Sequence, residues 1–500
     1  MMGIKPYQEK MFYDFSLEKR VPQDHLLRKV DKIIDLRFVR DLVAPYYSHT
    51  GQPSIDPEVL FRMMIIGYLY GVTSERRLAE DLSVNLAYMW YIRYDLDEEV
   101  PDHSVISKAR ARYGKKVFEE FFQRILQLCM DAGLVTGEKI HIDSTFIDAN
   151  ASKKSLVPRP EAIEVKYDPK EYVEQIYKQN ATDEGDFDEE QEKAEEMREL
   201  MENNPGINIW KSKKMSETES YRKKWNSNKD LVSKTDPDAA LSTKAHTKSK
   251  LTYKDHFSVD GNSRVITAVV TTNGAIGDEQ VLKKLVQKQP IKPKEVCADS
   301  KYGTGKNYEY LVKNGILASI PHWHASPKKR NSETWDTSVF QYDKEKDVFV
   351  CPNKKELKKA AYDLNSRHWC YRSAVSECSK CQFHIECLGK RSKQRLLTRH
   401  IYEDSINKTL EHLESERAKQ SIRERKYYAE LSIAEAKTYH GLRRTRFRGR
   451  WRVGIQVLLT ATVQNIKRLI KNNENKVKNT PPLPCPPVGN SIFQLILSPL

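Results

Sequence analysis

Apolar residues in the first 130 positions recur with helical spacing. Three segments carry this pattern: 57–71, 74–92 with a short polar break near Ser83, and 103–133. The last segment ends at a glycine, a common helix C-cap. The pattern predicts a helical N-terminal domain over 1–135. Arg76 and Arg77, near the start of one helix, suit a helix-turn-helix-like unit that binds DNA, although a generic helical bundle fits the pattern equally well.

The middle of the chain changes to the alternating pattern of strands. Expected strands lie at 138–148, on both sides of the turn in 253–274, at 294–299 and at 316–321, with helices at 278–290 and 307–315. The turn contains Asp260-Gly261-Asn262, a signal for a hairpin. Strands that alternate with helices in this order indicate an α/β domain with a mixed sheet over 136–322. Residues 151–250 are rich in charged and polar residues, which is typical of an insertion into such a domain.

Beyond residue 322 the pattern predicts three further segments. Residues 323–400 are rich in Cys and Lys and interrupt the α/β pattern. Residues 401–472 hold a long helix at 404–438, an Arg-rich stretch and an apolar helix at 453–471, while 473–500 form a Pro-rich tail.

Composition narrows the class of protein. The chain has 500 residues, a net charge of +15 and a pI near 9.1, so we expect several domains and a polyanionic partner, either nucleic acid or a membrane surface. No run of 18 apolar residues is present, so no membrane span is expected. The N-terminal residues lack the apolar region of a secretory signal, and eight cysteines are too few for a secreted disulfide scaffold. These features favour a cytoplasmic protein.

Carboxylates at strand ends are the candidate metal-binding groups. Asp143 and Asp299 each close an apolar strand, and two such aspartates side by side would make an oxygen site of the kind Mg²⁺ prefers, although a lone strand-end Asp more often forms a turn or a cap. A third carboxylate would come from the long helix, where the candidates are Glu424, Glu430 and Glu435. Helical spacing places Lys426, Glu430 and Lys437 on one face, a pattern that an ordinary ion pair also explains.

Three blocks in order resemble bacterial insertion-sequence transposases of the DDE class. They are HIDSTFIDANAS, then YKDHFSVDGNSRVITAVVTTNG with VCADSKYGTGKN, then RKYYAELSIAEAKTYHGLRRTRFRG. The N-terminal stretch PSIDPEVLFRMMIIGYLYG resembles the N-terminal domain of the same group. The resemblance implies a ribonuclease H-like catalytic domain, in which the first Asp lies on the first strand, the second at the end of the fourth and the Glu on a later helix.

The resemblance assigns the catalytic metal ligands to Asp143, Asp299 and Glu430, with Glu435 as the weaker alternative for the Glu. They would hold two Mg²⁺ ions, with Mn²⁺ as a substitute. The family signature around the Glu is Tyr-x₂-Arg-x₃-Glu-x₆-Lys. This chain keeps Lys437 but has Arg423 at the Tyr position and Lys426 at the Arg position, so Arg425, Tyr427 and Tyr428 become candidate substitutes. Asp148 is expected to brace the following loop.

A second candidate metal site lies in the Cys-rich segment. The C-x₂-C pair has further cysteines within about 30 residues, which is spacing typical of structural Zn²⁺. We favour four thiolate ligands, with His384 as an alternative fourth ligand and Cys370 as a buried residue. The favoured set is Cys351, Cys378, Cys381 and Cys387. Reduced cysteines that bind no metal are the alternative.

The Arg-rich stretch that follows the long helix is the second candidate DNA-binding element. Its arginines, together with the two signature lysines, would neutralise phosphates, although a solvated basic face is the alternative. The candidate residues are Lys426, Lys437, Arg443, Arg444, Arg446, Arg448 and Arg450.

The resemblance implies a transposase that binds the inverted-repeat ends of its insertion sequence, cleaves double-stranded DNA by metal-assisted hydrolysis and joins the 3′-OH ends to target DNA. It further implies at least a homodimer on DNA, in the cytoplasm and associated with the bacterial nucleoid. The alternatives are a catalytically inactive or domesticated DNA-binding relative, a metal-dependent nuclease without strand transfer, and a non-enzymatic RNA-binding protein.

Overall fold

The computed structural model describes residues 15–48, 50–158, 197–204, 207–210, 228, 231–243, 249–322, 334–389 and 392–479. Most of the charged insertion, the first part of the Cys-rich segment and residues 480–500 of the Pro-rich tail lie outside these ranges, so the expectations for those segments concern residues that are not described.

The N-terminal region is helical, as predicted. Its helices are α1 (Leu17–Arg20), α2 (Leu26–Ile33), α3 (Phe38–Val43), α4 (Pro57–Leu69), α5 (Glu75–Val84), α6 (Leu86–Ile92) and α7 (His103–Asp131). The segment expected at 74–92 is two helices, because the Asn85 side chain accepts hydrogen bonds from the backbone N–H groups of Ala87 and Tyr88 and so starts a new helix. Gly114, at φ 62°, kinks α7.

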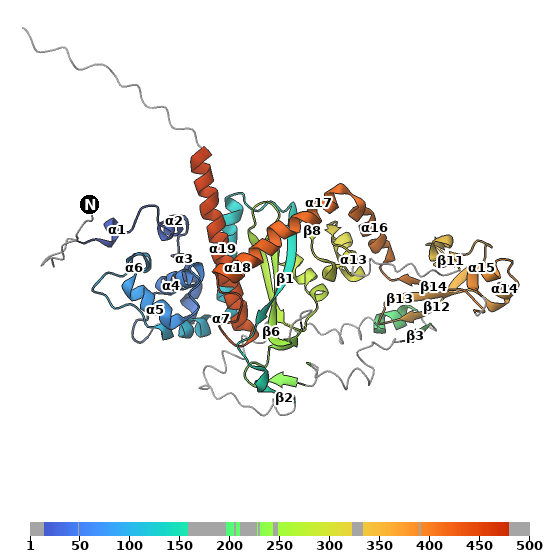
Figure 1. Ribbon diagram of the computed structural model, residues 1–500, viewed down its shortest axis with the longest axis horizontal. Coiled ribbons are helices and arrows are strands. Elements are labelled where there is room, and N and C mark those ends of the chain that lie inside the picture. The colour runs from blue at the N-terminus through green and yellow to red at the C-terminus, as the bar shows by residue number, and fades with distance from the viewer. Residues whose placement is uncertain are drawn as a thin grey trace, which may run out of the picture.

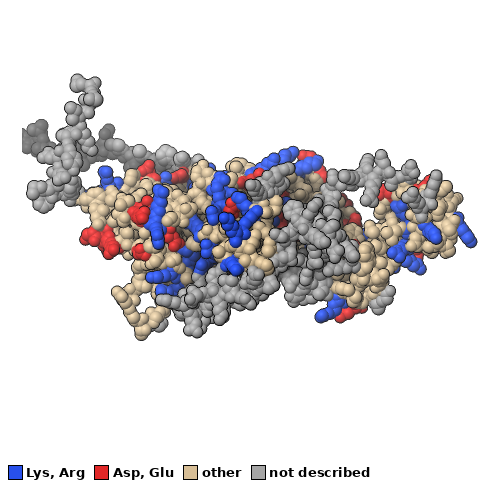
Figure 2. Space-filling model, turned by 60° about the horizontal axis from the view of Figure 1, so that its bottom comes forward, with Lys and Arg blue, Asp and Glu red and all other residues tan. Residues whose placement is uncertain are grey.

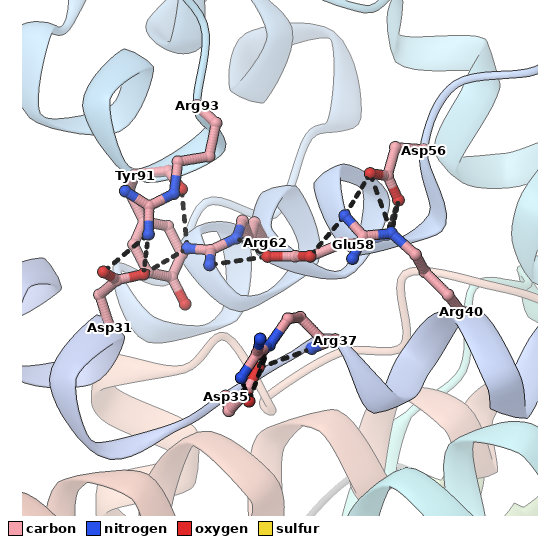
Figure 3. A network of polar contacts seen from close by, with 9 residues as sticks. All are labelled: Asp31, Asp35, Arg37, Arg40, Asp56, Glu58, Arg62, Tyr91 and Arg93. Carbon is pink, nitrogen blue, oxygen red and sulfur yellow. Dashed lines mark hydrogen bonds and ion pairs between the residues drawn. The ribbon is translucent and has the colours of Figure 1, made fainter.

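A buried ionic network ties these helices together (Figure 3). The Arg62 side chain is only 4% exposed, and its guanidinium lies 2.8 Å from the Glu58 carboxylate and 2.7 Å from that of Asp31. It also donates to the Tyr91 carbonyl at 2.9 Å. Because a buried guanidinium is costly without partners, this network fixes how α2, α4 and α6 pack.

The central sheet is mixed, as the sequence predicts. Its strands are β1 (Lys139–Asp148), β5 (Ala240–Ser242), β6 (Lys250–Asp260), β7 (Ile266–Asn273), β8 (Glu295–Cys297) and β9 (Leu317–Ser319). β1 lies between β6, which is antiparallel to it, and β8, which is parallel to it; β9 extends the parallel side, and both β5 and β7 pair with β6. The expected hairpin is β6–β7, and its turn is at Asp260-Gly261-Asn262.

Helices cover both faces of this sheet (Figure 1). On one face, Ile140 and Ile142 of β1 pack against the short helices α12 (Leu282–Gln287) and α13 (Gly305–Lys313). On the other face, residues of β1, β6 and β7 join a large apolar cluster with α7 and the long helix α19 (Arg450–Asn479). This cluster continues into the N-terminal helices, so the apolar core has no break at residue 135.

The segment expected as one long helix at 404–438 is interrupted twice. Its parts are α16 (Glu403–Glu414), α17 (Glu416–Arg425), a π-helical turn (Lys426–Glu430) and α18 (Leu431–Tyr439). Ser415 separates the first two, because its side chain accepts a hydrogen bond from the Ala418 N–H and caps α17. The π-helical turn has consequences for the candidate site.

The Cys-rich segment has a sheet and an apolar core of its own. Its elements are β10 (Gln341–Asp343), β11 (Val348–Val350), β12 (Glu356–Asp363), β13 (His368–Arg372), β14 (Leu396–His400), α14 (Val375–Ser379) and α15 (His384–Leu388). β3 (Asn208–Trp210), which belongs to the charged insertion, pairs with β12 in parallel, an association that the sequence did not suggest. A small pair, β2 (Leu156–Pro158) and β4 (Leu231–Ser233), lies apart from both sheets. Within the described ranges, every helix is too short or too polar to cross a membrane.

Candidate active site and basic cleft

The two candidate aspartates lie at the same edge of the sheet. The parallel pairing of β1 with β8 ends at His141 and Cys297, and Asp143 and Asp299 each follow two residues later. Asp299 was expected to close its strand, and it does follow β8. Asp143 was also expected at a strand end but lies within β1, because β1 continues along β6 to Asp148 after its pairing with β8 has ended.

Local hydrogen bonds orient both aspartates. The Asp143 carboxylate accepts from the Ser144 N–H at 2.8 Å, and the Asp299 carboxylate accepts from the Lys301 N–H at 2.8 Å. The second bond makes Asp299 the cap of the short 3₁₀ turn Ser300–Tyr302. Each carboxylate is therefore tied to the backbone of the residues that follow it.

Glu430 reaches Asp143 through the guanidinium of Arg425. Arg425 Nη1 lies 3.1 Å from Asp143 Oδ2, and Arg425 Nη2 lies 3.0 Å from Glu430 Oε1. Residues five apart share a face only where the helix widens to the i→i+5 pattern, and the turn from Lys426 to Glu430 is π-helical. The expectation that Lys426 shares a face with Glu430 assumed α-helical spacing; the π-helical turn gives that position to Arg425.

The charges of the three candidate carboxylates interact. Burial raises the pKa of Asp143 to about 6; Arg425 opposes this shift, whereas the nearby negative charges of Asp299 and Glu430 add to it. Among the residues that the structure describes, no three His, Cys, Asp or Glu side chains are grouped closely enough to enclose a metal ion. The donor types suit a hard divalent cation, and the Arg425 cation lies between two of them.

The two other glutamates considered from the sequence are held elsewhere. Glu424 pairs with Lys139 at 2.9 Å. Glu435 Oε1 lies 2.6 Å from Lys467 Nζ, and its other oxygen pairs with Arg468. Both glutamates are therefore engaged with cations outside the candidate site.

Glu435→Gln is expected to cost about 2 kcal/mol of unfolding free energy at pH 7, because hydrogen bonds to a charged group are lost in a largely buried place. Burial alone would raise the pKa of Glu435, but the hydrogen bond from Lys467 and the charge of Arg468 lower it well below its ordinary value. A carboxylate with a depressed folded-state pKa stabilises the protein above its unfolded pKa of about 4.3 and stops doing so as the pH falls through the folded-state value.

The stability gap between wild type and Glu435→Gln should therefore narrow as the pH falls below about 4, in urea unfolding measured at several pH values. Glu424→Gln, which removes a single partly exposed ion pair, is the control and should cost less than about 1 kcal/mol. If wild type and Glu435→Gln differ in unfolding free energy by the same amount at neutral and acid pH, the lowered pKa of Glu435 is contradicted.

The signature lysines are placed differently from each other. Lys437 Nζ donates to the Phe146 carbonyl of β1 at 3.1 Å. Lys426 is exposed, as is Arg423, and the ion pairs of the candidate carboxylates are made by Arg425 instead. Of the three substitutes considered from the sequence, the structure brings Arg425 into the site.

The end of β1 holds the Arg-rich stretch in place. The Asp148 N–H donates to the Arg443 carbonyl at 3.2 Å, and the Thr445 N–H donates to the Asp148 carbonyl at 2.8 Å. The Asp148 carboxylate points to Lys250, at 2.6 Å. Asp148 thus braces the loop after β1 and also fixes the arginine segment beside the sheet.

The N-terminal helices and the Arg-rich stretch together form a cleft of about 630 Å³. Of the DNA-binding candidates, Arg76 and Arg446 line it, while Arg77 does not and lies 3.7 Å from Asp81. Arg443, Arg444 and Arg448 are exposed, and Arg450 begins α19. The cleft also contains His103, Lys108 and Arg110, which were not candidates from the sequence, and Arg452, which belongs to the Arg-rich stretch.

The four favoured cysteines line one small pocket of about 30 Å³: Cys351, Cys378, Cys381 and Cys387. The backbone N–H of Lys355 donates to Cys351 Sγ at 3.4 Å, and the Asn353 side chain donates to Cys381 Sγ at 3.6 Å. His384 does not line the pocket; its Nδ1 donates to the Cys378 carbonyl at 2.8 Å. Cys370 is buried in β13 and does not line it either.

Comparison with known proteins places these features in a family. Residues 15–112 match a transposase domain (DUF772), and residues 350–470 match a transposase DDE domain. No curated protein and no solved structure matches the chain. The first match covers most of the N-terminal helices, and the second covers Glu430, the Arg-rich stretch and most of α19. The two matches support the identification of the chain as an insertion-sequence DDE transposase.

Proposed function

We propose that this transposase binds the inverted-repeat ends of its element, cleaves the DNA with Asp143, Asp299 and Glu430 as metal ligands, and joins the freed 3′-OH ends to target DNA. One observation carries the proposal. Arg425 bridges Asp143 and Glu430, which are 287 residues apart in sequence, within the electrostatic reach of Asp299. The three carboxylates provide the hard oxygen ligands that divalent ions prefer, and they would have to close around the ion as Arg425 releases Asp143 and Glu430.

The proposed fold of the catalytic region is ribonuclease H-like. Asp143 lies on the first strand of the central sheet, and Asp299 follows β8, which is the fifth of its six strands in chain order and the fourth when the short edge strand β5 is left out. Glu430 lies on a later helix. This order of acids along the elements is the order that the family resemblance implies.

Each side chain of the site has a part in the proposed reaction. Bound divalent ions, Mg²⁺ or Mn²⁺, would supply Lewis acidity to the scissile phosphate and to the attacking oxygen. The three carboxylates provide hard oxygen ligands, and their mutual repulsion favours cation binding. Arg425 is placed to neutralise a phosphate when it releases its carboxylates, and Lys437 holds the helix against β1 through the Phe146 carbonyl.

The test uses purified protein with Mg²⁺ and labelled DNA that carries the inverted-repeat ends flanking its gene. Cleavage together with joined products supports the proposal. Cleavage without joining would make the protein a nuclease, and tight binding without cleavage would make it an inactive relative.

The basic cleft is proposed to hold the DNA backbone beside the active site. Figure 2 shows Lys and Arg side chains over the middle of one face of the molecule. Because the cleft has one wall in the N-terminal helices and the other in the Arg-rich stretch, bound DNA would contact both at once. We place two copies of the chain on paired DNA ends, within the bacterial cytoplasm and nucleoid, where this substrate lies.

The double variant Arg76→Ala/Lys108→Ala is expected to weaken DNA binding and to reduce the slope of log K against log salt by about 2, because each removed cation would leave one phosphate without its partner. Binding is measured by fluorescence anisotropy in EDTA, where no cleavage occurs. Arg37→Ala is the matched control, since Arg37 is an exposed arginine of the same helical region that pairs with Asp35 and does not line the cleft. An unchanged slope in the double variant would exclude the cleft as the DNA site.

We also propose that the four-cysteine pocket holds a structural Zn²⁺ ion. Its volume of about 30 Å³ is enough for an ion, which needs no more space than a water molecule. Two N–H groups donate to its sulfur atoms, as is usual around thiolate ligands. Burial raises the pKa of Cys387, and the charges of the other three pocket cysteines add to the shift.

A further inference from the structure

A second buried group of charged and polar side chains lies beneath the candidate active site. It consists of Lys254 and His256 of β6, Asp278 at the start of a 3₁₀ turn, and Tyr302 after β8; each is at most 5% exposed. Its β6 residues face the side of the sheet away from Asp143, because Ser144, not Asp143, is the register partner of His256. The proposed reaction gives this cluster no part, and a buried ion pair costs too much desolvation to be explained by stability alone.

Hydrogen bonds connect these four side chains closely. Lys254 Nζ lies 2.9 Å from Asp278 Oδ2, and His256 Nδ1 lies 2.9 Å from the Tyr302 hydroxyl. His256 Nε2 lies 3.3 Å from the hydroxyl of Thr272, which itself donates to the Lys254 carbonyl at 3.2 Å. Since the Thr272 proton is used in that bond, its oxygen accepts from His256 Nε2–H.

This pattern fixes the direction of each bond. Burial lowers the pKa of His256 to about 3, so the ring is neutral and carries one N–H, on Nε2. Nδ1 is then an acceptor and takes the proton of the Tyr302 hydroxyl. Asp278 Oδ1, 3.4 Å from Nδ1, receives no hydrogen from the ring, and Asp278 Oδ2 lies 2.9 Å from Lys254 Nζ.

The cluster is attached to the backbone beside both Asp143 and Asp299. Ser144 follows Asp143 directly and is the register partner of His256 where β1 pairs with β6. Tyr302 is the last residue of the 3₁₀ turn that Asp299 caps. One end of the cluster therefore holds the backbone of Asp143, and the other end holds the turn that carries Asp299.

We propose that Asp278, His256 and Tyr302 form a positioning network that fixes the separation of Asp143 and Asp299 through Ser144 and the Ser300–Tyr302 turn. The proposal rests on the proposed function, since it assumes that these two carboxylates bind the metal ions together. The three residues touch neither substrate nor metal; they restrict the movement of the backbone on which the ligands stand.

Tyr302→Phe tests the network with the smallest change, because it removes only the hydroxyl that donates to His256. Asp278→Asn would leave Lys254 buried against a neutral group and is expected to fold poorly. Tyr308→Phe is the matched control: Tyr308 is also fully buried in the same apolar cluster and also loses one hydrogen bond, to the Ile320 carbonyl at 2.9 Å. Both variants should lose similar thermal stability.

The readout is Mn²⁺ affinity of the DNA-free protein, measured by electron paramagnetic resonance. Tyr302→Phe is expected to weaken binding by about 10-fold or more, the usual effect of losing support behind a metal ligand, while Tyr308→Phe stays at the wild-type value. In cleavage assays, Tyr302→Phe should raise the Mg²⁺ concentration for half-maximal rate but leave the KM for DNA and the rate at saturating Mg²⁺ near wild type.

Two results would overturn the proposal, and they are distinguishable. If Asp143→Ala abolishes Mn²⁺ binding but the two tyrosine variants bind equally well, the network is excluded and the proposed metal site stands. If wild-type protein shows no Mn²⁺ binding that depends on Asp143, the metal site itself is excluded and the network with it.

Discussion

Glu430→Gln is expected to abolish strand cleavage and joining while leaving DNA binding unchanged. The substitution keeps the shape of the side chain but removes the charge with which Glu430 would hold a divalent ion. Metal-assisted stabilisation is worth several kcal/mol in phosphoryl transfer, so the rate should fall by about a thousandfold or more. The Glu430 side chain is 45% exposed and forms its ion pair with Arg425, so the fold should tolerate the change.

The control for this prediction is Glu424→Gln. Glu424 lies in α17, immediately before the π-helical turn, and pairs with Lys139 instead of with the candidate site. It should retain wild-type cleavage. Asp143→Asn should behave like Glu430→Gln, because Arg425 bridges the two carboxylates. Wild-type cleavage by Glu430→Gln would exclude Glu430 as the third acid, and loss of activity in Glu424→Gln alone would move the assignment to that residue.

The π-helical turn explains why the family signature appears altered in this sequence. The signature expects an Arg four residues before the Glu, where this chain has Lys426. An extra residue in the helix shifts the shared face, so Arg425, five residues before Glu430, takes the place beside it. A prediction based on α-helical spacing misses this shift, because one added residue leaves the hydrophobic pattern almost unchanged.

The central sheet could be predicted from local sequence, because its signals are local. Alternation in β1 and the Asp260-Gly261-Asn262 turn between β6 and β7 indicated the strands and the hairpin. The expected strand at 138–148 agrees with β1, but its partner could not be predicted, because β6 lies more than 100 residues later. The same reason applies to β3, which pairs with β12 across about 150 residues.

The candidate sites could be predicted where the spacing of residues along the chain indicates their chemistry. They could not be predicted where they form only when distant segments pack together. The cysteine spacing was enough to select four residues that line one pocket. Only part of the cleft could be predicted from the sequence. Arg76 and Arg446 belong to segments that look unrelated in sequence, and these segments meet only when α7 and α19 pack together. The network of Asp278, His256 and Tyr302 was not predicted, because its residues come from three separate segments that meet only in the folded sheet.

Purified protein is expected to contain about one Zn²⁺ per chain, and Cys378→Ser is expected to lose it almost completely. A tetrahedral site with three thiolates binds zinc far more weakly than one with four, and binding free energy at a structural site is also folding free energy. Zinc is measured by mass spectrometry after dialysis. Loss of the ion should also make the segment that holds β10–β14 more sensitive to protease, since α14, α15 and the turn between them carry three of the four ligands.

Cys370→Ser separates zinc binding from the general cost of a cysteine substitution. Cys370 is buried in β13, in the same sheet, but does not line the pocket, so this variant should lose stability and keep its zinc. His384→Ala should keep its zinc as well, because His384 bonds the Cys378 carbonyl outside the pocket. If all three variants retain the metal, or if the wild type carries none, the four pocket cysteines are reduced thiols that do not bind zinc. The sheet of β10–β14 would then depend on its own apolar core, centred on Tyr362 and Tyr371.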